Sequence, residues 1–169
     1  MIDHRTNQED CKESAIALLH VDYSDFLFQL RDFKSTISYP GHWAGFGGEI
    51  ENEETPEHAC LRELQEELGY VPDSIKFFRD YFFGKTAGLV EQRAHLYIYY
   101  GPLTVPLSQL NLTEGLDFDL FNRQEILGGR LYSEKIKNFF PIPELLVRVF
   151  EDFFEFIAND HKSLAGPAK

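Results

Sequence analysis

Short apolar runs, each bounded by polar or turn-forming residues, recur along the chain and predict the strands of a sheet. We expect strands over residues 14–21, 26–31, 75–83, 91–100 and 116–121. Turn residues at 23–25 join the first two strands into a hairpin, and residues 85–89 form the turn of a second hairpin. The stretches 32–47 and 101–113, which contain glycine and proline, are expected to be loops.

An amphipathic helix is predicted between these strands, from Thr55 to Gly69. Thr55 can cap it, Pro56 is tolerated at the first helical position, and Gly69 accepts the left-handed conformation that often ends helices. At about 100° per residue, the apolar and acidic side chains separate onto two faces. The apolar side carries Cys60, Leu61, Leu64 and Leu68, and the acidic side carries Glu63, Glu66 and Glu67.

A second helix is predicted over residues 143–159, where apolar residues recur at helical spacing. Its stripe comprises Leu146, Val149, Phe150, Phe153 and Ile157, and it is widened by Leu145, Phe154 and Phe156. A helix that covers a sheet explains the stripe. The additional aromatic side chains also suit a homodimer contact, because large exposed apolar patches usually mark interfaces.

Strand hairpins, with one helix in the middle of the chain and one at its end, predict an α+β fold built as an αβα sandwich around a mixed sheet. The chain of 169 residues is long enough for one domain with a proper core. We place this domain at residues 13–159, after a flexible lead-in of residues 1–12. Residues 160–169 are expected to be a flexible tail.

Charge and composition narrow the classes of partner. The net charge of −12 argues against binding to nucleic-acid polymers or to anionic membrane surfaces. No apolar run approaches the roughly 18 residues that span a bilayer. Residues 1–12 are polar and mixed in charge, so we expect no signal peptide and a reduced, cytoplasmic location. Cys11 and Cys60 are far apart in sequence, and Cys60 is expected to be a buried thiol.

The acidic face of the first helix points to metal chemistry. Three carboxylates on one face repel each other, and a bound divalent cation would reverse the sign of that interaction. Hard oxygen ligands suit Mg²⁺ or Mn²⁺, usually together with substrate phosphates. The alternative is a solvated acidic face without a ligand.

The spacing around this helix resembles the Nudix box, Gx5Ex7REUxEExGU, of the Nudix hydrolases. Gly48 is followed by five residues and Glu54, then by seven residues and Arg62-Glu63-Leu64, and then by Glu66-Glu67 and Gly69. Tyr70 departs from the pattern, because the family usually has an aliphatic residue there. The resemblance implies the same mixed-sheet sandwich and extends over roughly residues 13 to 160.

The resemblance also implies roles for the box residues. Metal would be held by Glu63, Glu66 and Glu67 with a carbonyl near Gly48, and Glu54 would be an auxiliary acidic group. Catalysis would involve Arg62, which orients a glutamate and its loop, together with Glu63, Glu66 and Glu114. The general base is either Glu66 or Glu114, which precedes Gly115 as in a Glu-Gly pair of the family. Glu114 can equally be an ordinary loop carboxylate.

Three further residues are candidates for substrate binding. Arg93 alternates with His95, Tyr97 and Tyr99 along a predicted strand, so this face could line a nucleotide pocket or simply be solvated. Trp43 precedes the box, as an aromatic residue often does in the family, and Phe46 stands where many members have proline.

The implied activity is metal-dependent hydrolysis of a phosphoanhydride in a nucleoside diphosphate linked to another group X, such as a nucleoside triphosphate or nucleotide sugar. The products would be NMP and phosphorylated X. A non-catalytic nucleotide-binding or regulatory module of the same fold is the main alternative, beside an isomerase or an acidic interaction domain. The box does not select the substrate, and specificity is expected in the loops at residues 32–46, 84–92 and 101–122.

Overall fold

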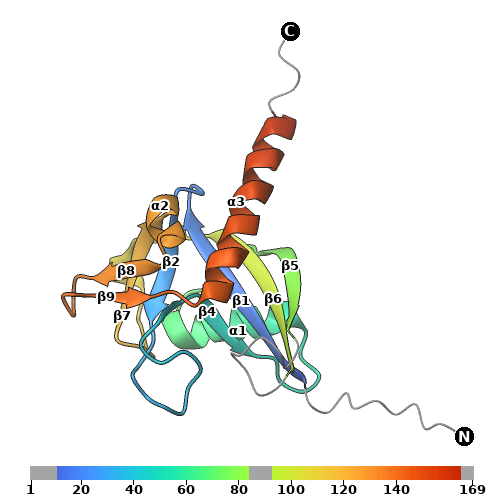
Figure 1. Ribbon diagram of the computed structural model, residues 1–169. Helices are drawn as coiled ribbons and strands as arrows, with labels where there is room; N and C mark the ends of the chain where they lie inside the picture. Colours follow the sequence, from blue (N-terminus) through green and yellow to red (C-terminus); the bar gives the residue numbers. More distant parts are fainter. Residues whose placement is uncertain (1–10, 84–92, 165–169) are drawn as a thin grey trace, which may run out of the picture.

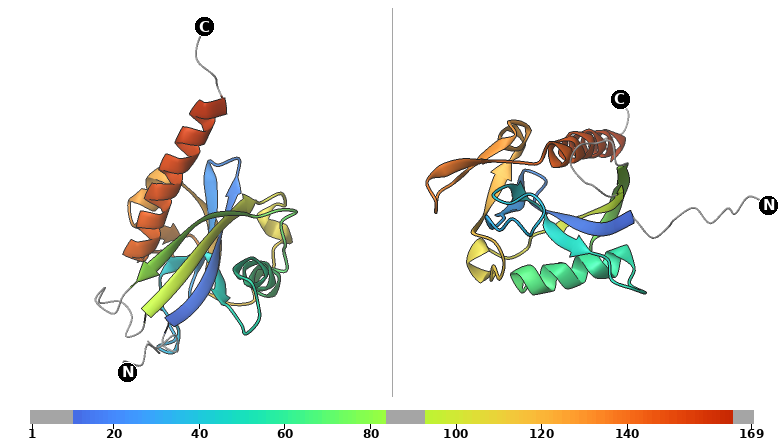
Figure 2. Two further views of the ribbon diagram at one scale, coloured as in Figure 1. Left: turned by 90° about the vertical axis from the view of Figure 1, so that its right-hand side faces the viewer. Right: turned by 60° about the horizontal axis from the view of Figure 1, so that its bottom comes forward.

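The computed structural model describes residues 11–83 and 93–164, with side chains described as far as residue 160. A mixed sheet forms the middle layer, with helix α1 on one face and helix α3 on the other (Figures 1 and 2). The predicted α+β sandwich is therefore confirmed.

The central order of the main sheet is β3-β2-β1-β6-β5, with β4 also pairing with β1 and β7 with β2. β1 and β6 are parallel, and the other described pairs are antiparallel. The strands of this sheet are β1 Cys11–Val21, β2 Asp25–Leu30, β3 Trp43–Ala44, β4 Phe46–Glu49, β5 Lys76–Phe83, β6 Arg93–Pro102 and β7 Asp117–Asn122. A separate hairpin comprises β8 Arg130–Ser133 and β9 Asn138–Pro141.

The helices are α1 Pro56–Leu68, α2 Arg123–Leu127 and α3 Glu144–Leu164, and residues Leu107–Gln109 form a short 3-10 turn, η2. The predicted ends of α1 are confirmed. Thr55 Oγ1 accepts a hydrogen bond from the backbone N–H of His58, and Gly69 ends the helix in the left-handed conformation. No helix of the described chain combines the length and apolar character needed to cross a bilayer.

Two apolar layers hold the sheet between its helices. The layer under α1 contains Cys60 and Leu64, and Cys60 is a buried free thiol, as predicted. The layer under α3 is aromatic: the ring of Phe26 makes edge contacts with Phe150 at 5.2 Å and Phe154 at 5.4 Å between centroids. Phe154 is thus buried in the core of this chain, whereas the side chain of Phe156 is more than one-third exposed. The homodimer stays a prediction.

Several predicted boundaries were wrong. β1 begins at Cys11, inside the expected lead-in, because Cys11 and Lys12 pair with β6. α3 continues to Leu164, into the expected tail. The region expected to be the 32–47 loop contains β3 and the start of β4, and the β8–β9 hairpin was not predicted at all. Residues 1–10 and 165–169 and the predicted turn at 85–89 lie outside the described residues.

The expected substrate-binding roles of Trp43 and Phe46 are corrected by their burial. Both side chains are 0% exposed, so neither presents a surface to a ligand. The Trp43 ring packs edge-on against Phe121, and its Nε1–H donates to the Leu131 carbonyl at 3.1 Å. Phe46 packs in the layer under α1. Both are core residues, because the segment before the box is a strand that runs into the sheet.

The Trp43→Phe variant should therefore lose stability. It removes the indole N–H that satisfies the Leu131 carbonyl, and the expected loss is about 1–2 kcal/mol in the free energy of unfolding. Urea denaturation followed by circular dichroism measures this loss. Val71→Ala, at an exposed aliphatic side chain after α1, is the control and should change stability by roughly 0.5 kcal/mol or less. An unchanged Trp43→Phe midpoint would contradict the core assignment.

A second feature of the fold is the buried imidazole of His20 at the end of β1. Its ring stacks on Tyr23 at 3.9 Å, and its Nδ1 accepts the Tyr23 backbone N–H at 3.3 Å. Burial lowers the pKa of His20 from 6.5 to about 4, with a smaller opposing effect from Asp22. The folded chain consequently holds this imidazole neutral at pH values where the unfolded chain binds a proton.

The contribution of His20 to stability should therefore fall as the pH drops from about 7 to 5. The unfolded imidazole protonates near 6.5 while the folded one stays neutral down to about 4, which costs roughly 2 kcal/mol of stability by pH 5. His20→Phe keeps the aromatic stack and should remove this part of the pH dependence, as measured by urea denaturation at both pH values. His58→Gln, at an exposed histidine, is the control. Equal pH dependence of wild type and His20→Phe would refute the assignment.

Candidate active site

The site begins where β4 leads into the loop before α1. Gly47 pairs with Ile16 of β1 at a φ of +140°, and a Cβ there would collide with the Ala15 carbonyl. At Gly48 a Cβ would instead collide with the carboxylate of Glu63 on α1. Gly47 thus allows β4 to lie against β1, and Gly48 allows the backbone to approach the acidic face of the helix.

Arg62 connects the loop to the helix. Its guanidinium donates to both carboxylate oxygens of Glu54 at 3.0 Å, to Glu63 Oε1 at 2.7 Å and to the Glu49 carbonyl at 3.0 Å. A longer contact of 3.5 Å joins it to Glu66. These bonds lower the pKa of Glu54 and raise that of Arg62. This geometry suits the expected positioning role of Arg62, which stays a prediction.

Glu67 is the buried carboxylate of the box, with 6% of its surface exposed. Its Oε1 accepts a hydrogen bond from Gln29 Nε2, and its Oε2 accepts one from the Gly47 backbone N–H, both at 3.0 Å. Burial raises its pKa to about 7, although the Gln29 and Gly47 bonds and the charge of Arg31 oppose this effect. Glu66, by contrast, is largely exposed.

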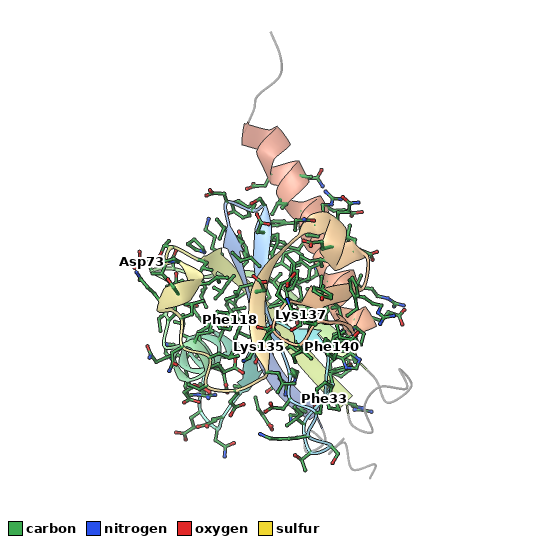
Figure 3. All side chains as sticks on the ribbon, turned by 90° about the vertical axis from the view of Figure 1, so that its left-hand side faces the viewer. Phe33, Asp73, Phe118, Lys135, Lys137 and Phe140 are labelled. Atoms are coloured by element: carbon green, nitrogen blue, oxygen red, sulfur yellow. The ribbon has the colours of Figure 1, made fainter. Side chains whose placement is uncertain are left out.

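The loop that carries Glu114 is attached to the same end of α1. The Thr113 hydroxyl donates to the Glu66 carbonyl at 2.7 Å, and the Thr113 N–H donates to the Glu67 carbonyl at 3.0 Å. Lys135, which is labelled in Figure 3, lies in the turn between β8 and β9. Its Nζ donates to the Leu116 carbonyl at 2.7 Å. Glu114 itself is exposed, beside the helix end that carries Glu66 and Glu67. Its role stays a prediction.

Tyr70, the departure from the box pattern, holds another loop. Its hydroxyl donates to the Pro102 carbonyl at 2.9 Å and accepts the Thr104 N–H at 3.2 Å. The phenol thus ties the segment after β6 to the end of α1. This role is structural, and the hydroxyl provides contacts that an aliphatic side chain does not.

Arg93 lies at the first residue of β6 and is exposed. It is opposite Cys11 of β1, whereas Ala15, the partner of Gly48, is opposite Tyr97. Along β6, Arg93 therefore lies four residues, or roughly 13 Å, from Tyr97, which is in register with Gly48 through Ala15. The structure does not bring Arg93 together with the box residues, and substrate binding by it stays a prediction.

The oxygen donors fit a hard divalent cation, although in the described structure no three acidic, histidine or cysteine side chains converge as a metal-binding group. Glu63 is bonded to Arg62, and Glu67 to Gln29 and Gly47. The Gly48 backbone nevertheless lies against the Glu63 carboxylate, without an intervening side chain. Carboxylate and backbone carbonyl oxygens are ligands that Mg²⁺ accepts.

Sequence reasoning missed Gln29, Arg31 and Thr113. The signal for Gln29 was a single amide inside the apolar strand segment FLFQL, where an uncharged polar residue needs a partner. Arg31 and Thr113 carried no comparable signal, because both fall in stretches read as strand end and loop.

Known proteins resemble this chain in sequence and in fold. A short segment is 62% identical to an 8-oxo-dGTP diphosphatase from Proteus vulgaris over 29 residues. That match covers 17% of this chain and only 26% of the relative. Among solved structures, a MutT protein from Methanosarcina mazei Go1 superposes with a TM-score of 0.68 at 20% identity, covering 89% of this chain and 97% of the other. The E. coli ORF135 protein gives 0.65 at 21% identity, covering 95% and 96%.

A third structure, the NUDIX domain of Shewanella oneidensis NrtR complexed with ADP ribose, gives a TM-score of 0.64 at 15% identity and covers 93% of this chain and 94% of the other. At these identities the structural matches show the fold. The family itself is shown by the sequence model of the NUDIX domain, which matches residues 13–141. Because that match covers most of the chain, the protein belongs to the Nudix hydrolase family, as its box predicted.

Proposed function

We propose that this chain hydrolyses a phosphoanhydride in a nucleoside diphosphate linked to X, using Mg²⁺ or Mn²⁺ and releasing NMP plus phosphorylated X. The observation that carries the proposal is the close approach of the Gly48 backbone to the Glu63 carboxylate, with Glu66 and Glu67 on the same helix. Nucleoside triphosphates are the first class to test, because the short Proteus vulgaris match is to an 8-oxo-dGTP diphosphatase.

The metal would be held by Glu63, Glu66 and Glu67 with the carbonyl of Gly48. Once bound, it would neutralise phosphate oxygens, make the phosphorus more electrophilic and make water more acidic. Arg62 supports this set by holding Glu54 and Glu63 in place. Glu66 and Glu114 are the two candidates to accept the proton of the attacking water, because both are exposed and lie at the same end of α1.

An anionic substrate also needs cations in a protein of net charge −12. Arg62 is committed to carboxylates. Arg31 is partly buried at the end of β2, and its charge is close enough to lower the pKa of Glu67. Its Nε donates to the Ser38 carbonyl at 2.8 Å, which fixes the side chain. Arg31 is therefore our candidate for contact with substrate phosphate, in addition to the metal.

The activity is tested by measuring product release from nucleoside triphosphates including 8-oxo-dGTP, nucleotide sugars and ADP-ribose, each with Mg²⁺, Mn²⁺ or EDTA. We expect metal-dependent NMP release from one class and a loss on the order of 100-fold in Glu67→Gln, because that carboxylate is both buried and bonded at the site. No release from any substrate, with ligand-induced thermal shifts still present, would support the non-catalytic module instead.

Gly48→Ala should separate activity from stability. The new Cβ meets the far end of the flexible Glu63 side chain, which can move away, so the fold should be retained. Displacement of a site carboxylate by about 1 Å should reduce turnover on the order of 100-fold. Thermal melting and steady-state turnover measure the two effects.

Gly129→Ala is the matched control. Gly129 has a φ of +73°, and a Cβ there would meet nothing within 4 Å. This variant should lose about 1 kcal/mol of stability through backbone strain and keep its turnover. Wild-type turnover in Gly48→Ala would show that activity does not depend on the close approach of Gly48 to Glu63, and would contradict the proposed function.

A further inference from the structure

Gln29 is a buried amide in a strand that is otherwise apolar. It is 1% exposed and follows Phe28 and precedes Leu30, which are both fully buried. Leu27, two residues before it, packs in the layer under α1, so Gln29 points to the same face of the sheet. An apolar residue would fill this position without the desolvation cost of an amide, so the amide requires a partner.

That partner is the site carboxylate. Gln29 Nε2 donates to Glu67 Oε1 at 3.0 Å and reaches the Gly45 carbonyl at 3.4 Å. Both contacts are to acceptors, which sets the orientation of the amide. The Gly47 N–H holds the second oxygen of Glu67, so each carboxylate oxygen has one donor and the rotation of the group is restricted.

The same amide lies beside the loop that carries Glu114, which bonds β2 through the Leu116 N–H and the Leu30 carbonyl at 2.7 Å. A Cβ at Gly115 would lie 3.2 Å from Gln29 Oε1 and 2.8 Å from the Leu30 carbonyl, so the loop packs directly against β2. Gln29 is therefore located where the box helix, the glycine strand and the Glu114 loop meet. A side chain in this place can fix their relative positions.

We propose that Gln29 is a positioning residue of the Nudix site, and that its amide holds the Glu67 carboxylate in the orientation used for divalent metal binding. The proposal rests on the proposed function. It goes beyond that function because Gln29 lies outside the Nudix box, on the strand behind the helix. Gln29 acts through Glu67 and the adjacent backbone.

The test measures Mn²⁺ affinity by electron paramagnetic resonance without substrate, together with kcat and KM, in Gln29→Met. Methionine has a similar length and no hydrogen-bond donor. Loss of a partner behind a metal ligand typically costs 10- to 100-fold in metal affinity or activity. We therefore expect Mn²⁺ affinity to fall about tenfold or more, with kcat reduced more than KM changes. Gln124→Met, at an exposed glutamine on α2, is the control.

A double-mutant comparison separates positioning from a general structural effect. If Gln29 acts through Glu67, Gln29→Met should change Mn²⁺ affinity by less than about twofold in the Glu67→Gln background. An equal loss in both backgrounds, or wild-type Mn²⁺ affinity in Gln29→Met, would overturn the proposal and leave the proposed function intact.

The remaining outcomes are also decisive. Gln29→Leu is measured in parallel in case methionine does not fit. Leucine is already present at position 27, which faces the same layer under α1. If neither variant folds, Gln29 is a structural residue and the positioning proposal is wrong. Wild-type protein that neither binds Mn²⁺ nor hydrolyses a nucleotide would overturn the proposed function itself.

Discussion

The burial of one carboxylate constrains much of the site. A carboxylate removed from water is stable only when its oxygens are hydrogen-bonded, and Glu67 obtains one donor from a strand side chain and one from the glycine backbone. These bonds require β2, β4 and α1 to keep one relative placement. The αβα sandwich supplies it, because the apolar layer under α1 holds that helix against the sheet. The hydrogen bonds to Glu67 therefore depend on the apolar packing of α1 against the sheet.

The two glycines, Gly47 and Gly48, also fix the position of the site carboxylates, through their backbone. Gly47 provides the N–H that bonds Glu67, and it can do so only where no Cβ collides with the neighbouring strand. Gly48 brings the next peptide against Glu63. The Nudix spacing thus has a physical meaning in this chain. The number of residues between the glycines and the glutamates sets the length of the loop that connects β4 to α1. Arg62 of α1 bonds Glu54 in this loop and the Glu49 carbonyl at the end of β4.

Local signals predicted much of this arrangement, and contacts distant in sequence account for the errors. The cap at Thr55, the end at Gly69 and the two faces of α1 depend on neighbouring residues, so they could be inferred from the sequence. The burial of Trp43 could not, because it depends on Leu131 and Phe121, which are 88 and 78 positions away. The β8–β9 hairpin was missed because each of its strands has only four residues. Gln29 was missed because its partner is 38 residues distant.

Arg62 is the centre of charge balance among the carboxylates of the box. The one guanidinium inside the box makes contacts with Glu54, Glu63 and, at longer range, Glu66, so it offsets the repulsion between these carboxylates. A divalent cation would compete with Arg62 for Glu63, since both favour the same oxygens. Metal binding and release of that oxygen from Arg62 should therefore be coupled. The remaining bonds of Arg62, to both oxygens of Glu54 and to the Glu49 carbonyl, would keep the loop in place during the exchange.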